Sequence, residues 1–92
     1  MAALRAQSES IRALGATALY MFGSTARDQA TASSDLDLFL DYDDARRFSL
    51  IELAGIQHLL RERLGVAVDV TTRDSLDPLL RGKIEATAVR VF

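Results

Sequence analysis

The chain has no cysteine, one proline and one histidine among its 92 residues. Without cysteine it can form no disulfide, no thiolate zinc site and no cysteine nucleophile, and we expect a cytoplasmic, prokaryotic protein. It also lacks a basic excess: the net charge is −2 and the 11 Lys and Arg are scattered, so we expect no direct contact with nucleic acid. No apolar run approaches the roughly 18 residues of a membrane span, and residues 1–14 do not resemble a signal peptide. We therefore expect a soluble protein.

What the chain does contain is a regular succession of apolar segments. Its length and its 49% apolar content predict one domain, residues 1–92, with one modest core. Apolar spacing and turn residues predict seven elements and a tail. These are a helix over 2–14, strands over 17–22 and 35–41 with a short helix over 25–30 between them, a helix over 49–64, a strand over 66–71, a short helix after Pro78, and a last strand or packed tail over 89–92.

The order α-β-α-β-α-β-α predicts an α/β fold with a small mixed sheet of three to four strands flanked by helices. We expect the first two strands to be antiparallel, because the turn that ends the first must lie near the start of the second. The long helix should begin with a capping box at Ser49 and Glu52 and end at Gly65. Two sets of apolar residues should face inward: Leu50, Leu53, Ile56, Leu60 and Leu64 in this helix, and Leu79, Leu80 and Ile84 in the last one.

Three aspartates stand out by their positions in the predicted strands. Asp35 and Asp37 are two residues apart, so on an extended strand both side chains leave the same face. Asp69 lies between Val68 and Val70, where an unpaired carboxylate would be costly to bury. Salt bridges to arginine would account for one carboxylate, whereas divalent metal accounts for all three, because Mg²⁺ prefers oxygen ligands and shares its shell with phosphates. The sequence therefore predicts a Mg²⁺ site that suits phosphoryl or nucleotidyl transfer.

A turn that suits phosphate precedes these aspartates. Gly23 lets the backbone approach a phosphate closely, and Ser24 is placed as the N-cap of the short predicted helix, whose exposed N–H groups attract anions. Arg27 adds a cation one turn later, although it is also the obvious salt-bridge partner for one aspartate. Alone, the Gly-Ser turn would indicate only helix capping. The Ser-Asp-Leu-Asp-Leu segment ten residues later makes the combination specific.

Together these segments closely resemble a known signature. Gly23-Ser24-Thr25-Ala26-Arg27, followed by Ser34-Asp35-Leu36-Asp37-Leu38, resembles the motif of the minimal nucleotidyltransferases (MNT), small members of the DNA polymerase β-like superfamily. Val68-Asp69-Val70 is similar to the third aspartate strand of that family, and residues 78–85 to its C-terminal helix. The resemblance covers nearly the whole chain. One departure is Asp28, where the family often has glycine, although an acid suits the first turn of a helix.

The resemblance implies a Mg²⁺-dependent transferase with ATP as its substrate. Asp35 and Asp37 would hold two Mg²⁺ ions, and Asp69 would complete one metal site and help to activate the attacking hydroxyl. The acceptor hydroxyl would attack the α-phosphate and release pyrophosphate. The phosphate-binding residues would be Gly23, Ser24, Arg27 and Ser34.

The resemblance also implies a partner protein. Family members of this size are similar to antitoxins encoded beside a HEPN-domain toxin ribonuclease, which they silence by transferring AMP to a tyrosine. The chain fits that role because it has no second domain to hold a small-molecule acceptor. Two alternatives remain: a non-catalytic antitoxin that acts by complex formation, and a transferase subunit for a small molecule such as an aminoglycoside.

Other residues of interest have simpler explanations. His58 falls away from the apolar stripe of its helix, so we expect a solvated surface histidine. Ile51 and Leu59 also lie off that stripe, which leaves open a partner surface. Tyr20 and Phe22 are expected in the core.

Overall fold

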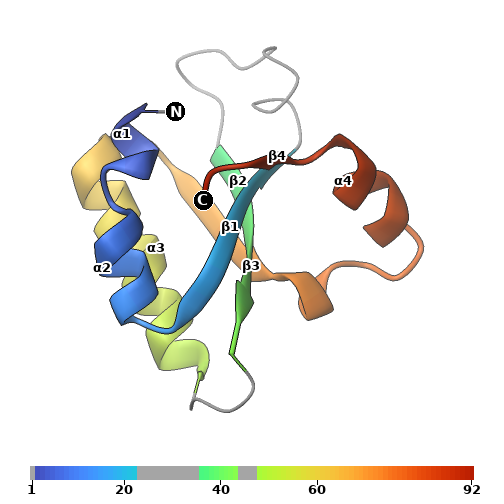
Figure 1. Cartoon of the computed structure of the whole chain (residues 1–92), viewed down its shortest axis with the longest axis horizontal. Helices are drawn as coiled ribbons and strands as arrows, with labels where there is room; N and C mark the ends of the chain where they lie inside the picture. Colours follow the sequence, from blue (N-terminus) through green and yellow to red (C-terminus); the bar gives the residue numbers. More distant parts are fainter. Residues whose placement is uncertain (1, 23–35, 44–47) are drawn as a thin grey trace.

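Four strands form the centre of the fold (Figure 1). The structure is a computed structural model and describes residues 2–22, 36–43 and 48–92. In chain order its elements are α1 (Ala2–Arg5), α2 (Ser8–Ala13), β1 (Ala16–Phe22), β2 (Leu36–Tyr42), α3 (Leu50–Leu64), β3 (Val68–Thr72), the 3₁₀ turn η1 (Arg73–Ser75), α4 (Arg81–Thr87) and β4 (Val89–Arg90). No helix among the described residues is long and apolar enough to cross a membrane.

The strands form one mixed sheet in the order β3-β2-β1-β4. β1 is antiparallel to both β2 and β4, and β2 is parallel to β3. The predicted fold class, a small mixed sheet with flanking helices, is confirmed, as is the antiparallel pairing of the first two long strands. β2 and β3 therefore begin at the same end of the sheet, which is also the end where β1 finishes.

One face of the sheet carries the main core. Side chains alternate between the faces of a strand, and the alternating apolar residues of β1, β2 and β3 point to α1, α2 and α3, which lie together on this side (Figure 1). The fully or nearly fully buried residues of this core include Leu4, Ile11, Leu19, Leu38, Leu40, Ile56, Leu60, Val68 and Val70. The opposite face carries Tyr20, Phe22, Asp37, Phe39, Asp41 and Asp69, and we call it the carboxylate face.

The predicted capping box of α3 is confirmed. The Ser49 hydroxyl accepts a hydrogen bond from the Ile51 N–H at 3.2 Å, and the Glu52 carboxylate accepts one from the Ser49 N–H at 2.8 Å. At the other end Gly65 adopts φ +69°, the left-handed conformation that favours glycine. Both ends of the helix are thus set by the residues that the sequence indicated.

We expect the capping box to contribute to the stability of the fold. Replacing Ser49 by alanine should lower the free energy of unfolding by about 1 kcal/mol, because N–H groups of the first turn lose their acceptor. Urea denaturation measures this change. Ser10→Ala, at an exposed position inside α2, is the matched control and should cause no loss, because alanine favours helix. Equal losses in both variants would contradict a specific capping role.

The apolar stripe of α3 is confirmed only in part. Ile56 and Leu60 are fully buried, but Leu50 is 80% exposed because it lies in the first turn, at the edge of the stripe. Ile51 is 82% exposed, as its position predicted, whereas Leu59 is partly buried and packs against the core. An exposed stretch at the start of α3 therefore remains, and Leu59 does not belong to it.

Two other segments differ from the sequence predictions. The predicted single N-terminal helix is two helices, because the Gln7 N–H bonds to the Leu4 carbonyl three residues back and tightens the chain there. The third strand begins at Val68, since residues 65–67 form the bend that follows α3. Val66, predicted on its inner face, is 40% exposed.

The C-terminal segment also begins differently from its prediction. Asp77 does accept a hydrogen bond from the Leu79 N–H at 2.9 Å, but it caps a turn over 78–80, and α4 starts only at Arg81. Leu79 and Leu80, predicted to face inward, are 92% and 52% exposed because they lie in this turn. The last residues form both a short strand and a packed tail, which were the two predicted alternatives. β4 pairs with β1, and Val91 after it is buried and donates its N–H to the Leu19 carbonyl at 2.8 Å.

Candidate active site

The carboxylate face brings two of the three predicted aspartates side by side. Asp37 of β2 pairs in register with Asp69 of β3, and neighbouring strands lie about 4.8 Å apart. Phe22 of β1 is paired with Asp37 on its other side. Asp37 is half-buried and Asp69 is exposed, so the argument that Asp69 would be costly to bury was wrong. Two carboxylates in register at an accessible edge nevertheless make a compact set of hard oxygen donors, which fits Mg²⁺.

The other predicted site residues lie outside the described part of the chain. This applies to the third aspartate, to the phosphate-binding candidates and to the short helix that would carry some of them: Asp35, Gly23, Ser24, Arg27, Ser34 and residues 25–30. Within residues 2–22, 36–43 and 48–92, no group of three or more His, Asp or Glu could hold a metal ion. Asp37 and Asp69 would supply donors from two strands, and the predicted set needs Asp35 for the third.

Next to the aspartate pair lies a layer of aromatic rings. Phe39 is fully buried although it lies on the carboxylate face. Tyr20 stacks on it with the ring centroids 4.9 Å apart, and Phe22 tilts against it at 5.6 Å. The expectation that Tyr20 and Phe22 belong to the core is right in part, since both are half-buried. The aspartate pair is therefore bordered by a second, smaller apolar cluster.

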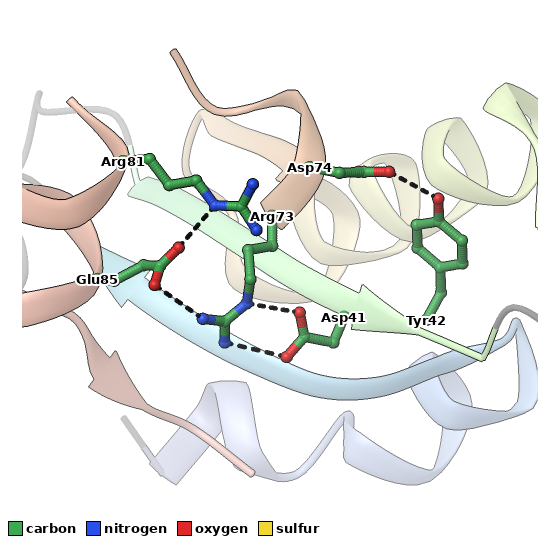
Figure 2. A network of polar contacts seen from close by, with 6 residues as sticks. All are labelled: Asp41, Tyr42, Arg73, Asp74, Arg81 and Glu85. Atoms are coloured by element: carbon green, nitrogen blue, oxygen red, sulfur yellow. Dashed lines mark hydrogen bonds and ion pairs between the residues drawn. The ribbon is translucent and has the colours of Figure 1, made fainter. Parts of the chain in front are cut away.

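An arginine that the sequence analysis missed covers this cluster. Arg73 donates from Nε to Asp41 Oδ1 at 2.7 Å and from Nη2 to Asp41 Oδ2 at 3.0 Å, and its Nη1 lies 3.4 Å from Glu85 Oε2 of α4 (Figure 2). Its guanidinium carbon lies 4.9 Å from the Tyr20 ring centroid and 5.1 Å from that of Phe39. The hydrogen bonds that Arg73 donates to Asp41 are the main cause that raises the pKa of Arg73. This cation is therefore already neutralised by two carboxylates.

A signal for Arg73 was present in the sequence. Asp69, Thr71 and Arg73 are spaced by two residues, so an extended chain places all three on the same face. The predicted third strand ends at Thr71, two residues before Arg73, so the pairing of Arg73 with Asp41 is not among the sequence predictions.

At the same end of the sheet, Asp74 accepts a hydrogen bond from the Tyr42 hydroxyl at 2.8 Å (Figure 2). The pKa of Asp74 is lowered below its ordinary value, mainly by a hydrogen bond from the Thr72 side chain and to a smaller extent by the one from Tyr42. A lowered pKa means that this carboxylate stabilises the fold above its unfolded pKa of about 3.9, and that the contribution is lost as the pH falls through the folded value.

The lowered pKa of Asp74 can be tested by titration. Thr72→Val should raise the pKa of Asp74 toward its ordinary value, because the hydroxyl donor is lost, and Tyr42→Phe should do so to a smaller extent. Carboxyl ¹³C NMR titration measures both changes. An unchanged Asp74 titration in Thr72→Val would show that the hydroxyl does not favour the charged form.

The remaining candidate, His58, is a surface residue as predicted. Its side chain is 75% exposed and lies 3.5 Å from Glu62 one turn along α3. His58 lies on α3, which packs against the opposite face of the sheet from the aspartate pair, so we assign it no role at that pair.

Comparison with known proteins identifies the family of this chain. A sequence model of the nucleotidyltransferase domain family matches residues 4–91. A candidate protein adenylyltransferase of Methanocaldococcus jannaschii is 38% identical over 72 residues, which cover 78% of this chain and 75% of the relative. A second candidate protein adenylyltransferase of the same organism is 32% identical, over 77% of this chain and 71% of the relative. The chain therefore belongs to the nucleotidyltransferase domain family, an enzyme family.

Solved structures show which fold within this family the chain has. A candidate minimal nucleotidyltransferase superposes with a TM-score of 0.76 at 34% identity, over 94% of this chain and 90% of that chain. A toxin–antitoxin complex with AMP-PNP gives 0.76 at 18% identity, over 96% and 72%. A complex of tri-AMPylated Shewanella oneidensis HEPN toxin with its MNT antitoxin gives 0.67 at 16%, over 96% and 68%. At these low identities the two complexes show the fold alone, which is that of the minimal nucleotidyltransferases, and the predicted family is confirmed.

Proposed function

We propose that the protein transfers AMP from ATP to a hydroxyl group of a partner protein, with Mg²⁺ as its cofactor. The observation that carries the proposal is the in-register pair Asp37 and Asp69 on the carboxylate face of a nucleotidyltransferase fold. The Methanocaldococcus relatives named as candidate protein adenylyltransferases support protein as the acceptor class. The neighbour containing AMP-PNP supports an adenine nucleotide as donor.

The proposed partner is a HEPN-family toxin, and the proposed acceptor is a tyrosine hydroxyl on it. Support comes from the structural neighbour in which a tri-AMPylated HEPN toxin is bound to an MNT antitoxin. The protein would then act in the cytoplasm as an antitoxin, with residues 1–92 forming a single minimal domain. Its partner would supply the acceptor hydroxyl.

In this reaction the acceptor oxygen forms a bond to the α-phosphorus as the bond to the bridging oxygen breaks, and pyrophosphate leaves. Asp69, which is exposed, would help to activate the attacking hydroxyl by accepting its proton, and Asp37 would hold Mg²⁺ together with Asp35. Bound Mg²⁺ would neutralise the charge that develops on the phosphates. The contribution of the protein is alignment and charge balance.

The test uses the protein and the product of its neighbouring gene. Both are incubated with ATP and Mg²⁺, and intact mass spectrometry and peptide mapping should find one or more AMP groups on a tyrosine of the partner. The absence of label on any partner protein would overturn the proposal. A complex that neutralises the toxin equally well with Asp37→Asn would favour the non-catalytic antitoxin, and label on a small amine or alcohol would favour the small-molecule transferase.

A further inference from the structure

α4 has little apolar packing to hold it in place. None of its residues is buried, and Ile84 and Glu85 are only half-buried. A helix of seven residues is not stable alone in water, and exposed side chains add little hydrophobic free energy. The position of α4 beside the sheet (Figure 1) must therefore depend on other contacts.

One of these contacts is the ion pair of Arg73 with Glu85, in which Nη1 and Oε2 lie 3.4 Å apart. Figure 2 shows the Arg73 guanidinium between Asp41 of β2 and Glu85 of α4. The bidentate pair with Asp41 and the stacking on Tyr20 and Phe39 fix the planar guanidinium on the sheet. Because its sheet side is rigid, the guanidinium presents Nη1 to Glu85 in one direction. We call the set Asp41, Arg73 and Glu85 the bridge.

The bridge is not itself a nucleotide site. The depression lined by Asp41, Tyr42, Arg73, Asp74 and neighbouring residues has a volume of about 220 Å³, below the roughly 300–1,000 Å³ of typical ligand pockets. It also lies four residues along β2 from Asp37, about 13 Å. Arg73, held between two carboxylates, is poorly suited to bind phosphate.

The course of the chain links the bridge to the aspartate pair. α4 leads directly into β4, where Val89 pairs with Met21. The next residue of β1, Phe22, is the cross-strand neighbour of Asp37. The C-terminal end of α4 therefore lies at the same end of the strands as Asp37 and Asp69, with β4 two strands away from Asp37.

We propose that Arg73 is a positioning residue: through the bridge it holds α4 beside the carboxylate face. In this position α4 would border the substrate-binding site around Asp37 and Asp69. The catalytic part of this inference rests on the proposed function. The structural part, the tethering of α4, does not. Loss of the bridge leaves the aspartates in place but reduces the fraction of molecules in which α4 is docked.

The tether is tested by hydrogen exchange, which needs no activity. Glu85→Gln and Arg73→Gln should speed amide exchange in α4 by about fivefold or more and leave α3 unchanged. Arg81→Gln is the matched control, because it removes the Arg81–Glu85 pair at 2.8 Å within α4 and keeps the bridge. Unchanged exchange in α4, or an equal effect in Arg81→Gln, overturns the tether.

Kinetics test the functional part. If docked molecules fall to about one tenth, the KM for substrate rises about tenfold with little change in kcat, since saturating substrate restores the docked state. Arg73→Lys, which keeps the charge but not the fork, should fall between wild type and Arg73→Gln. A loss of kcat with unchanged KM, or kinetics like wild type despite faster α4 exchange, overturns the positioning role. An inactive wild-type protein would overturn the proposed function, and with it the catalytic part, while hydrogen exchange still decides the tether.

Discussion

Replacing Asp37 by asparagine should lower kcat/KM for AMP transfer by a factor on the order of 100 or more, because a carboxylate of the predicted metal set is lost. The fold should be retained. Asp37 and Asp69 are paired in register on neighbouring parallel strands, and two like charges so close together repel each other. Without metal, Asp69→Asn should therefore keep or slightly raise the stability while it also removes activity.

The measurement combines transfer assays with urea denaturation of the same variants. Glu9→Gln, an exposed acid on α2 far from the carboxylate face, is the control for the change in charge and should behave as wild type. Activity retained by Asp37→Asn would remove it from the catalytic set. Unfolding of both aspartate variants would instead point to a structural role for the pair.

The aspartate pair could be predicted because it depends on local rules. A period of two places alternate residues on one face, and short apolar runs bounded by turn residues mark β2 and β3. The helix between β2 and β3 suits a parallel crossover, but the register that pairs Asp37 with Asp69 is known only from the structure. The capping box at Ser49 was predictable for the same reason, since its partners are three residues apart.

The errors concern features that depend on distant parts of the chain. Leu79 and Leu80 have an inward-facing pattern, but Asp77 forms a turn before α4 and leaves both exposed. The bridge joins Asp41, Arg73 and Glu85 from three elements, and no spacing rule connects residues so far apart in sequence. The alternating pattern predicts one buried face of the sheet, but apolar side chains are buried on both faces. Phe39 lies on the carboxylate face and is fully buried, with Tyr20, Phe22 and Arg73 as its neighbours there.

Phe39→Ala should have the largest effect on stability, a loss of about 3–5 kcal/mol. The side chain is fully buried, and its ring contacts two aromatic neighbours and the Arg73 guanidinium, so truncation opens a cavity and removes the surface on which Arg73 lies. A chain of this length is expected to have a total stability of only about 5–14 kcal/mol. Urea denaturation should therefore show a large shift of the midpoint.

Phe39→Leu separates packing from the support of the bridge. Leucine retains most of the apolar volume, so it should cost clearly less than alanine and keep the protein folded at 25 °C. It lacks the ring face that lies under Arg73, so exchange in α4 should still be faster than in wild type. If Phe39→Leu leaves α4 exchange unchanged, the pair with Asp41 alone fixes Arg73; if leucine costs as much as alanine, ring stacking with Tyr20 and Phe22 contributes more than buried volume.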